Sequence, residues 1–595
     1  MSQLDRLRAA AQAEPGSGPR WDAPGVALAQ AGSLAEALKT LRRALMLAPD
    51  RPEIHNNYGN VLQRTGDFAG AIVCYRAALE RRPDYAEARA NLGVALQATG
   101  DALAAIDCFN AVLAARPEDG ASWSHRGAAL TALGRLCEAE QSHCRAVLAS
   151  PERADSYNNF AILLKDLGRL GEARELYATA MQCAPHDAGI HSNALMCLCY
   201  DETVDGPAMV AAHRRWAARH APRRAAPAFD DYADSGPLRI GYVSPDFRAH
   251  TVADFLDSVF RCHDQDRVTL FCYSDAAMPD AMTARLRDGA ANWHDAFATS
   301  DADLADQIRA DRIQVLVDLA GHTANNRLAV FAHRAAPVQV TWLGYGATTG
   351  LPQIDYRLTD ARIDPPGVAD AWWTERLYRL PGGSLCYTPP SDCPLPDAVE
   401  PGPVTFGSFN NLSKINAAVV ALWARVLNRV DGSRLLLKAR QLADPATGER
   451  LRQQFESHGV AATRIEFAAR TQSYHDHMAC YGKVDVALDS FPYNGATTTC
   501  EVLWMGTPVV TLAGERSVAR YGLSLLHAAN CAGWATHDPD EFVAIAAGLA
   551  GSRPARAALR ARIAKSPLTD ARAVAAGLED AFHAMWRGWC DRVKL

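Results

Sequence analysis

Three consecutive threonines follow a glycine turn in the second half of the chain. The surrounding segment, residues 485–508, reads DVALDSFPYNGATTTCEVLWMGTP and predicts a strand, a glycine turn, a helix and a second turn. Thr497, Thr498 and Thr499 would occupy the N-terminus of that helix, where free backbone N–H groups and the positive end of the helix dipole favour a phosphate. Glu501, one turn further on, could accept hydrogen bonds from a ribose. In the alternative reading, a threonine caps the helix and Glu501 completes the cap.

Three other polar clusters carry weaker signals. The pair Asp301-Ala-Asp303 resembles a metal-binding motif, but it precedes an apparent helix at 304–310, so helix capping explains it better. The loop that contains Gly344 follows a strand without the G-x-G-x-x-G spacing, and we expect it to line a cleft. His475-Asp-His477 has no Cys or Glu partner at ligand spacing, which favours a surface helix over a metal site. The sequence therefore predicts no metal site.

Short, continuous apolar runs alternate with helical segments in this half of the chain. Continuous rather than alternating runs are typical of parallel strands that are covered on both faces. Two consecutive α/β lobes suggest a cleft at the carboxyl ends of their strands, as in dehydrogenases, kinases and many glycosyltransferases, so the fold alone does not decide the chemistry. The expected strands are 238–244, 268–274, 313–319 and 338–342, and, after the proline-rich stretch 388–403, 404–409, 435–438, 465–468, 484–489 and 508–512.

The first 200 residues contain a repeat with a period of 34 residues. Each unit is expected to form two antiparallel helices, because small residues let the helices approach closely, glycine ends the first helix and proline blocks continuation of the second. Neighbouring units must stack to cover their apolar faces. The spacing is typical of a tetratricopeptide solenoid over about 24–200. The repeated positions are Pro49, Pro83, Pro117, Pro151 and Pro185; Gly32, Gly66, Gly100, Gly134 and Gly168; Ala37, Ala71, Ala105, Ala139 and Ala173; and Gly59, Gly93 and Gly127, with Ala161 in the fourth place.

A polar ladder follows the same period at Asn57, Asn91, His125 and Asn159. Stacked repeats would place these side chains along one surface, where the amides can pair with the backbone of an acceptor peptide. Alternatively, each asparagine packs within its own helix pair. Both readings stay open at this point.

Four further segments accompany the threonine segment: RIGYVSPDFRAH at 239–250, DLAGHT at 318–323, PVQVTWLGY at 337–345 and FNNLSKI at 409–415. The ordered set resembles the protein O-GlcNAc transferases and the related SPINDLY-type protein O-fucosyltransferases of glycosyltransferase family 41. The resemblance covers residues 190–590 as well as the repeats. It implies two facing Rossmann-like lobes of the GT-B type and an inverting, metal-independent transfer from a nucleotide sugar to a Ser or Thr hydroxyl, with no cofactor.

The resemblance also assigns roles to individual residues. Lys414 matches the lysine that holds the diphosphate leaving group, and a lysine at a strand end suits that task, although plain solvent exposure is the alternative. His250 matches a histidine near the sugar and the acceptor, where either proton handling or structural hydrogen bonding would fit. Asn411 stands in place of a donor-contacting glutamine, and His477 in place of a histidine near the nucleotide base.

The identity of the donor is the open question of this comparison. Animal O-GlcNAc transferases have His-Thr-Thr followed by Asp where this chain has Ala496 and Glu501, and the residues that flank their base-contacting histidine correspond to Tyr474 and Cys480. We expect GlcNAc transfer from UDP-GlcNAc. The alternatives are GDP-fucose, a CMP-linked nonulosonic acid used on flagellin, and a peptide-binding scaffold whose transferase domain is inactive.

Length and composition set the remaining limits. A chain of 595 residues exceeds a single core and should divide into several domains. A net charge of -6 without dense basic runs argues against nucleic acid, and the apolar runs are too short for membrane spans. Fifteen scattered cysteines without a Cys-x-x-Cys pair indicate reduced thiols and a cytoplasmic protein. The expected parts are a tail (1–23), the solenoid (24–200), a linker with a helix at 206–220 (201–235), an N-terminal catalytic lobe (236–395), a C-terminal donor-binding lobe (396–565) and a terminal helix (566–595).

Overall fold

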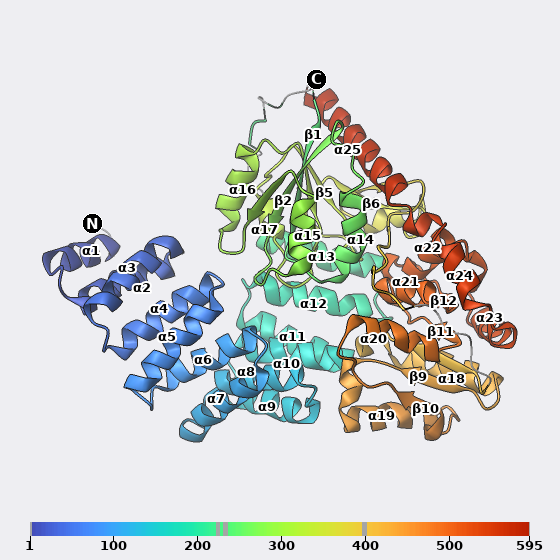
Figure 1. Cartoon of the computed structure of the whole chain (residues 1–595), viewed down its shortest axis with the longest axis horizontal. Helices are drawn as coiled ribbons and strands as arrows, with labels where there is room; N and C mark the ends of the chain where they lie inside the picture. The colour runs from blue at the N-terminus through green and yellow to red at the C-terminus, as the bar shows by residue number, and fades with distance from the viewer. Residues whose placement is uncertain (1–2, 222–226, 230–231, 233–235, 395–401, 594–595) are drawn as a thin grey trace. The chain divides into compact units, whose positions relative to one another are not determined.

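A computed structural model describes residues 3–221, 227–229, 232, 236–394 and 402–593 (Figure 1). The chain divides into two compact units. The first runs to Phe160 and includes Phe297–Ser300, and the second comprises the rest of the described chain. The fold prediction is confirmed: helical repeats are followed by two parallel α/β sheets. No helix of these described ranges is long and apolar enough to cross a bilayer.

The repeats form consecutive helix pairs, as the 34-residue period predicts. The glycines at the turn inside each pair, from Gly32 to Gly168, have φ between 75° and 90°, a conformation that glycine adopts without strain. The helices are α1 (Gln3–Ala13), α2 (Gly18–Gln30), α3 (Leu34–Leu47), α4 (Pro52–Arg64), α5 (Phe68–Arg81), α6 (Ala86–Ala98), α7 (Ala102–Ala115), α8 (Gly120–Ala132), α9 (Leu136–Ala149), α10 (Ala154–Asp166), α11 (Leu170–Cys183) and α12 (Ala188–Tyr200).

The conserved spacing of small residues reflects close helix contacts. A Cβ atom at Gly93 would lie 2.7 Å from the ring of Phe109, and one at Gly59 would lie 2.8 Å from the ring of Tyr75. These distances are too short for any larger side chain. The predicted reason for the small positions is therefore confirmed.

The segment expected to be an N-terminal tail is helical instead. Residues 1–23 contain α1 and the start of α2, and Leu4 packs against the core that Leu28 and Leu41 form. Ala11 is fully buried. Helix α1 thus covers part of the apolar face of the pair that α2 and α3 form.

The first lobe is a seven-stranded parallel sheet with the order β3-β2-β1-β4-β5-β6-β7. Its elements are β1 (Leu238–Ser244), α14 (Thr251–Phe260), β2 (Val268–Ser274), α15 (Ala281–Asp288), β3 (Asn292–Asp295), α16 (Asp301–Ala310), β4 (Val315–Asp318), α17 (Leu328–Ala332), β5 (Val338–Thr341), β6 (Tyr356–Thr359) and β7 (Arg376–Arg379). The start of α16 at Asp301 confirms that the Asp-Ala-Asp sequence begins a helix.

The second lobe is a six-stranded parallel sheet with the order β10-β9-β8-β11-β12-β13. Its elements are β8 (Thr405–Ser408), α18 (Ala417–Arg429), β9 (Arg434–Leu437), α19 (Pro445–Glu456), β10 (Ile465–Phe467), α20 (Tyr474–Ala479), β11 (Val486–Leu488), α21 (Thr497–Trp504), β12 (Val509–Leu512), α22 (Tyr521–Ala528), β13 (Ala535–Thr536), α23 (Pro539–Ser552), α24 (Arg556–Ile563) and α25 (Ala571–Val593).

The sequence prediction missed four strands, namely β3, β6, β7 and β13, whereas it found the end strand β10. β3 and β7 are partly exposed edge strands with charged or polar residues, so they lack the continuous apolar pattern of the central strands. β6 and the two-residue β13 are too short to stand out. Pairing with a neighbour, rather than local preference, makes these segments strands.

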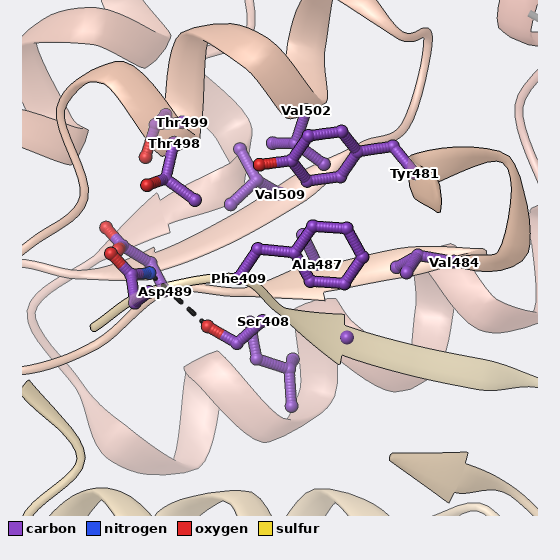
Figure 2. Close-up of a pocket in the computed structure, with 13 residues that line it drawn as sticks. Ser408, Phe409, Tyr481, Val484, Ala487, Asp489, Thr498, Thr499, Val502 and Val509 are labelled. Atoms are coloured by element: carbon purple, nitrogen blue, oxygen red, sulfur yellow. Dashed lines mark hydrogen bonds between the residues drawn. The ribbon is translucent and has the colours of Figure 1, made fainter. Parts of the chain in front are cut away.

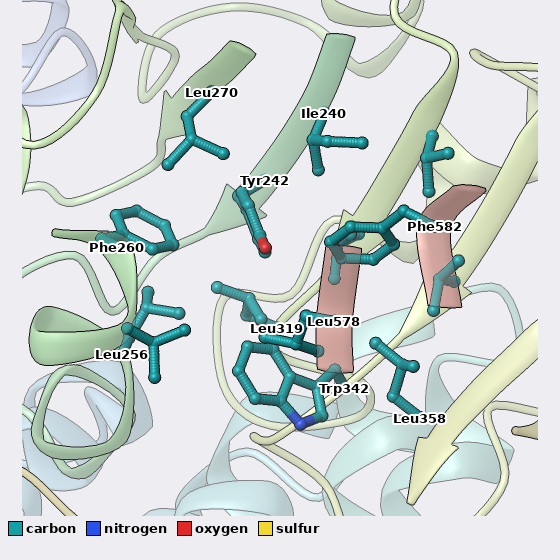
Figure 3. Packing of buried hydrophobic residues seen from close by; sticks show 14 of the residues in the cluster. Ile240, Tyr242, Leu256, Phe260, Leu270, Leu319, Trp342, Leu358, Leu578 and Phe582 are labelled. Atoms are coloured by element: carbon teal, nitrogen blue, oxygen red, sulfur yellow. The ribbon is translucent and has the colours of Figure 1, made fainter. Parts of the chain in front are cut away.

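The terminal helix α25 returns to the first lobe. Leu578 and Phe582 of α25 lie in one buried cluster with Tyr242 of β1 and Trp342, which follows β5 (Figure 3). A helix at 566–595 was expected, but no local signal in the sequence identifies the lobe that it covers.

The region expected to be a linker is part of the second unit. α13 (Gly206–His220) has the predicted bounds, but its buried face packs on the first lobe. His213 Nε2 lies 2.8 Å from the hydroxyl of Tyr345. The hydroxyl of Ser192, in α12, lies 3.0 Å from Nδ1 of His322 in the first lobe. The last repeat and α13 are therefore built into the second unit, which begins before residue 200. Part of the polar stretch 222–235 lies outside the described residues.

Candidate functional site

The candidate site lies where the second sheet reverses its strand order. The chain runs from β8 outward to β9 and β10 and then returns to β11, on the other side of β8. The carboxyl ends of β8 and β11 therefore flank the crevice in which open α/β sheets bind ligands. The loop after β8 carries Asn410, Asn411 and Lys414, and the loop after β11 leads into α21. A small pocket between the strands β8, β11 and β12 and helix α21 is lined by Asp489 and Thr498, among others (Figure 2).

The ammonium of Lys414 points into the turn before α21. Its Nζ donates to the backbone oxygen of Asn494 at 2.9 Å and lies 3.5 Å from Oδ1 of Asn410. The same atom lies 4.5 Å from the centre of the Tyr493 ring. Removal from water lowers the pKa of Lys414 to about 8, and the nearby Asp489 carboxylate opposes this shift. The side chain is thus held within the site rather than extended into solvent.

A buried aspartate fixes the turn itself. Oδ1 of Asp489 accepts hydrogen bonds from the backbone N–H groups of Ser490, at 2.9 Å, and Gly495, at 2.7 Å. Oδ2 accepts from the hydroxyl of Thr511 at 3.0 Å. Burial raises the pKa of Asp489 to about 6, although these hydrogen bonds and Lys414 favour the charged form.

Helix α21 begins at Thr497, as predicted. Its N-cap residue is Ala496, and no side chain of the described residues caps the helix there. Thr499 is buried, and its hydroxyl donates to the backbone oxygen of Gly495 at 3.0 Å, whereas Thr497 and Thr498 are half-buried. The capping alternative is therefore wrong for the side chains. The first N–H groups of a helix have no partner within the helix, so those of α21 could be satisfied by a ligand.

Glu501 is nine-tenths buried and anchors its neighbours. One carboxylate oxygen accepts from the hydroxyl of Tyr474 at 2.7 Å, and the other accepts from the hydroxyl of Tyr481 at 2.8 Å. Nε2 of His477 lies 3.3 Å from the second oxygen. Both oxygens thus have protein partners, and the expected ribose contact remains a prediction.

Lys438 extends this network from the end of β9. Its Nζ lies 2.6 Å from Nδ1 of His477 and donates to the hydroxyl of Thr471 at 3.1 Å. An ammonium only donates, so Nδ1 accepts, and the Nε2–H group of His477 donates to Glu501. Burial lowers the pKa of Lys438. His477 therefore has a fixed tautomer and orientation at the edge of the crevice.

His250 lies in the first lobe, in the loop that follows β1. It is the N-cap residue of α14, where its Nδ1 accepts from the backbone N–H of Val252 at 3.3 Å. Nδ1 also lies 3.6 Å from a carboxylate oxygen of Asp246. Burial lowers the pKa of His250, although Asp246 acts in the opposite direction. The side chain is about one third exposed and is thus accessible to a ligand.

Two other predicted donor residues have structural contacts. Asn411 is exposed, and its Oδ1 accepts from Nε2 of Gln441 at 2.9 Å. A Cβ atom at Gly344 would lie 2.0 Å from the backbone oxygen of Leu319, so only glycine fits between the loops that follow β4 and β5. Neither observation tests contact with a donor.

The ladder side chains lie in the first unit, where they make hydrogen bonds between neighbouring repeats. Their pairing with the backbone of an acceptor peptide remains a prediction. Nδ2 of Asn91 donates to Oδ1 of Asn56 at 2.9 Å, and Nδ2 of Asn159 donates to Ser124 at 3.0 Å. Each of these hydrogen bonds joins one repeat to the preceding one. His125 stacks on Phe109, with ring centres 5.7 Å apart. Asn57 contacts Asp22 in the same inter-repeat manner.

Sequence reasoning missed Lys438, Asp489 and Asn410. Each directly follows or ends an apolar strand, and a polar residue at that position of a parallel sheet was the available signal. In the described ranges, no group of three or more His, Cys, Asp and Glu side chains is arranged to hold a metal ion.

The sequence profile of glycosyl transferase family 41 matches residues 221–385 and 391–577. Tetratricopeptide profiles match residues 25–66, 50–118 and 153–184. Among curated proteins, the probable UDP-N-acetylglucosamine–peptide N-acetylglucosaminyltransferase SPINDLY of Arabidopsis thaliana is 40% identical over 415 residues, and that of Solanum lycopersicum is 39% identical over 415. Both alignments cover 67% of this chain, but only 45% and 44% of the relatives.

A solved structure resembles most of the chain. A point mutant of the Thermobaculum terrenum O-GlcNAc transferase superposes with a TM-score of 0.77 and 33% sequence identity. The match covers 91% of this chain and 98% of that protein, so it includes repeats and both lobes.

Proposed function

Because this chain belongs to glycosyltransferase family 41, we propose that it is an inverting protein O-glycosyltransferase that moves GlcNAc from UDP-GlcNAc to Ser or Thr. One observation carries the proposal: the uncapped N-terminus of α21 adjoins the turn that holds the Lys414 ammonium. Backbone N–H groups, a helix dipole and a cation converge on the carboxyl edge of the sheet. This is the arrangement that a diphosphate requires.

In the proposed reaction, the acceptor hydroxyl attacks the anomeric carbon while the bond from that carbon to the diphosphate oxygen breaks, and the proton of the hydroxyl is released to solvent. Negative charge grows on the leaving diphosphate, and Lys414 and the N–H groups at Thr497 and Thr498 stabilise it. This preorganised positive end supplies the charge stabilisation within the protein itself. Metal-independent transfer is therefore part of the proposal.

His250 suits hydrogen bonding better than proton abstraction. Its Nδ1 accepts the Val252 N–H, so the neutral ring carries its proton on Nε2. That tautomer presents a donor to the site, not a base. We therefore assign His250 to orienting a donor or acceptor oxygen.

The remaining parts of the proposal concern partners and location. The half-buried amides of Asn57, Asn91 and Asn159 would contact the acceptor polypeptide along the repeats, although they also join the repeats to each other.

All fifteen cysteines are free thiols, which supports a reducing compartment such as the cytoplasm.

The test compares nucleotide sugars and then transfer. Of UDP-GlcNAc, GDP-fucose and a CMP-linked nonulosonic acid, UDP-GlcNAc should raise the melting temperature most, since a ligand that binds only the native state stabilises it. The Lys414→Ala variant should lose transfer to an acceptor protein, while Lys483→Ala, a change elsewhere in the same lobe, should retain it. Preference for another donor would identify that donor instead. Absence of binding by all three would leave a scaffold function for the repeats.

A further inference from the structure

The last helix of the repeat array ends beside the residue that holds the Lys414 ammonium. The ring of Tyr200, the last residue of α12, stacks on the ring of Tyr493, with centres 4.9 Å apart and an angle of 20° between the planes. The Tyr493 ring in turn faces the ammonium of Lys414 at 4.5 Å. The ring of Tyr493 thus lies between Tyr200 of the repeats and Lys414 of the proposed donor site.

The end of α12 is held from the second lobe. The guanidinium of Arg516 donates to the backbone oxygens of Leu198, at 3.1 Å, and Asp201, at 2.7 Å. These two carbonyls flank Tyr200 in the sequence. Tyr200 itself is only 9% exposed. The backbone around Tyr200 is therefore held by the second lobe, and its ring is buried against that of Tyr493.

The turn of the last repeat also contacts the loop that carries Lys414. The position of a Cβ atom on Gly168 lies 3.4 Å from the backbone oxygen of Leu412 and 3.5 Å from that of Ile415. Arg450 of the second lobe donates to the backbone oxygen of Leu167 at 3.3 Å. Gly168 thus meets the loop that carries Lys414, and Tyr200 meets the loop that carries Tyr493.

We propose that Tyr200 is a positioning residue for the proposed transferase reaction: it fixes the Tyr493 ring, and through that ring the Lys414 ammonium that meets the diphosphate. The face of an aromatic ring attracts a cation and restricts where it lies. If the Tyr493 ring turned, Lys414 would lose this contact and keep only its hydrogen bonds to the turn. The last repeat is then part of the donor site, in addition to any role in recruiting an acceptor. This inference rests on the proposed function.

The experiment measures UDP binding to the full-length protein by titration calorimetry. Tyr200→Ala should weaken UDP binding roughly three- to thirty-fold, the range expected for impairing a cation–ring contact. Tyr200→Phe keeps the stacked ring and should bind within twofold of the wild type. The control Arg440→Ala removes a contact of the last repeat with the second lobe, 3.5 Å from Asp166, without touching Tyr493, and should also bind normally.

A double-mutant comparison separates positioning from a general structural effect. In a Lys414→Met background, Tyr200→Ala should change UDP binding less than twofold, because the group that Tyr200 positions is gone. Equal UDP binding by wild type and Tyr200→Ala, or an undiminished effect of Tyr200→Ala without Lys414, would overturn this inference alone. A wild type that binds none of UDP, GDP and CMP would overturn both this inference and the proposed function.

Discussion

Raising the pH from 7 to 9 should weaken UDP binding about tenfold, because it removes the proton from Lys414 in the free protein. Burial lowers the pKa of Lys414 to about 8. The protonated fraction falls from about nine-tenths at pH 7 to about one-tenth at pH 9, and only the ammonium attracts the diphosphate. A lysine with an ordinary pKa near 10.4 would stay charged over this range, and the affinity would barely change.

Titration calorimetry at pH 7, 8 and 9 would measure this effect. The terminal phosphate of UDP has its second ionisation near pH 6, so the ligand keeps the same charge throughout. The matched variant Lys414→Arg stays protonated and should show no such loss between pH 7 and 9. This variant also separates Lys414 from Lys438, whose pKa burial lowers as well.

Two results would refute the reasoning. A wild-type affinity that is constant from pH 7 to 9 would mean that the Lys414 ammonium is not needed for binding or is not shifted. The same tenfold loss in Lys414→Arg would mean that another group, with Lys438 the first candidate, controls the pH dependence.

Three further predictions concern the support of the site and the repeats. Glu501→Gln should lower the free energy of unfolding by about 1–3 kcal/mol, because two buried tyrosine hydroxyls lose a charged acceptor. The control Glu466→Gln, at a side chain that is 43% exposed, should change it little. Chemical denaturation measures both variants. Gly344→Ala should lower the free energy of unfolding by about 1–3 kcal/mol or more, because its methyl group clashes with the backbone oxygen of Leu319. The control Gly382→Ala has open space around it and should leave this free energy unchanged. Asn91→Ala should raise KM for an acceptor protein about fivefold, which is the equivalent of one hydrogen bond. The affinity for UDP should not change. An unchanged KM would contradict the hypothesis that the ladder binds the acceptor.

The architecture could be predicted because its signals are periodic. A 34-residue interval identifies each helix pair, and the continuous apolar runs identify the central strands with shifts of one or two residues at their ends. The N-terminus of α21 could be placed at Thr497 because a glycine turn and a helical pattern meet there. Edge strands such as β3 and β7 could not be found, since pairing with a neighbour determines them.

The contacts within the site could not be predicted in the same way. Glu501, Tyr474 and Tyr481 lie on segments up to 27 residues apart, and only the folded sheet brings their side chains together. The Tyr200–Tyr493 stack joins residues almost 300 positions apart, and no local pattern marks either tyrosine. Burial, which sets the pKa values of Lys414 and Asp489, likewise depends on the whole fold.

The placement of α12 and α13 within the second unit has a consequence for protein engineering. An exchange of repeat arrays between members of the family that cuts at residue 200 would separate Tyr200 and Ser192 from the surfaces that they fit. A graft at the turn around Pro151 would keep α10 to α12 with their native catalytic half. Chimeras joined at this earlier turn should retain nucleotide binding while they acquire new protein clients.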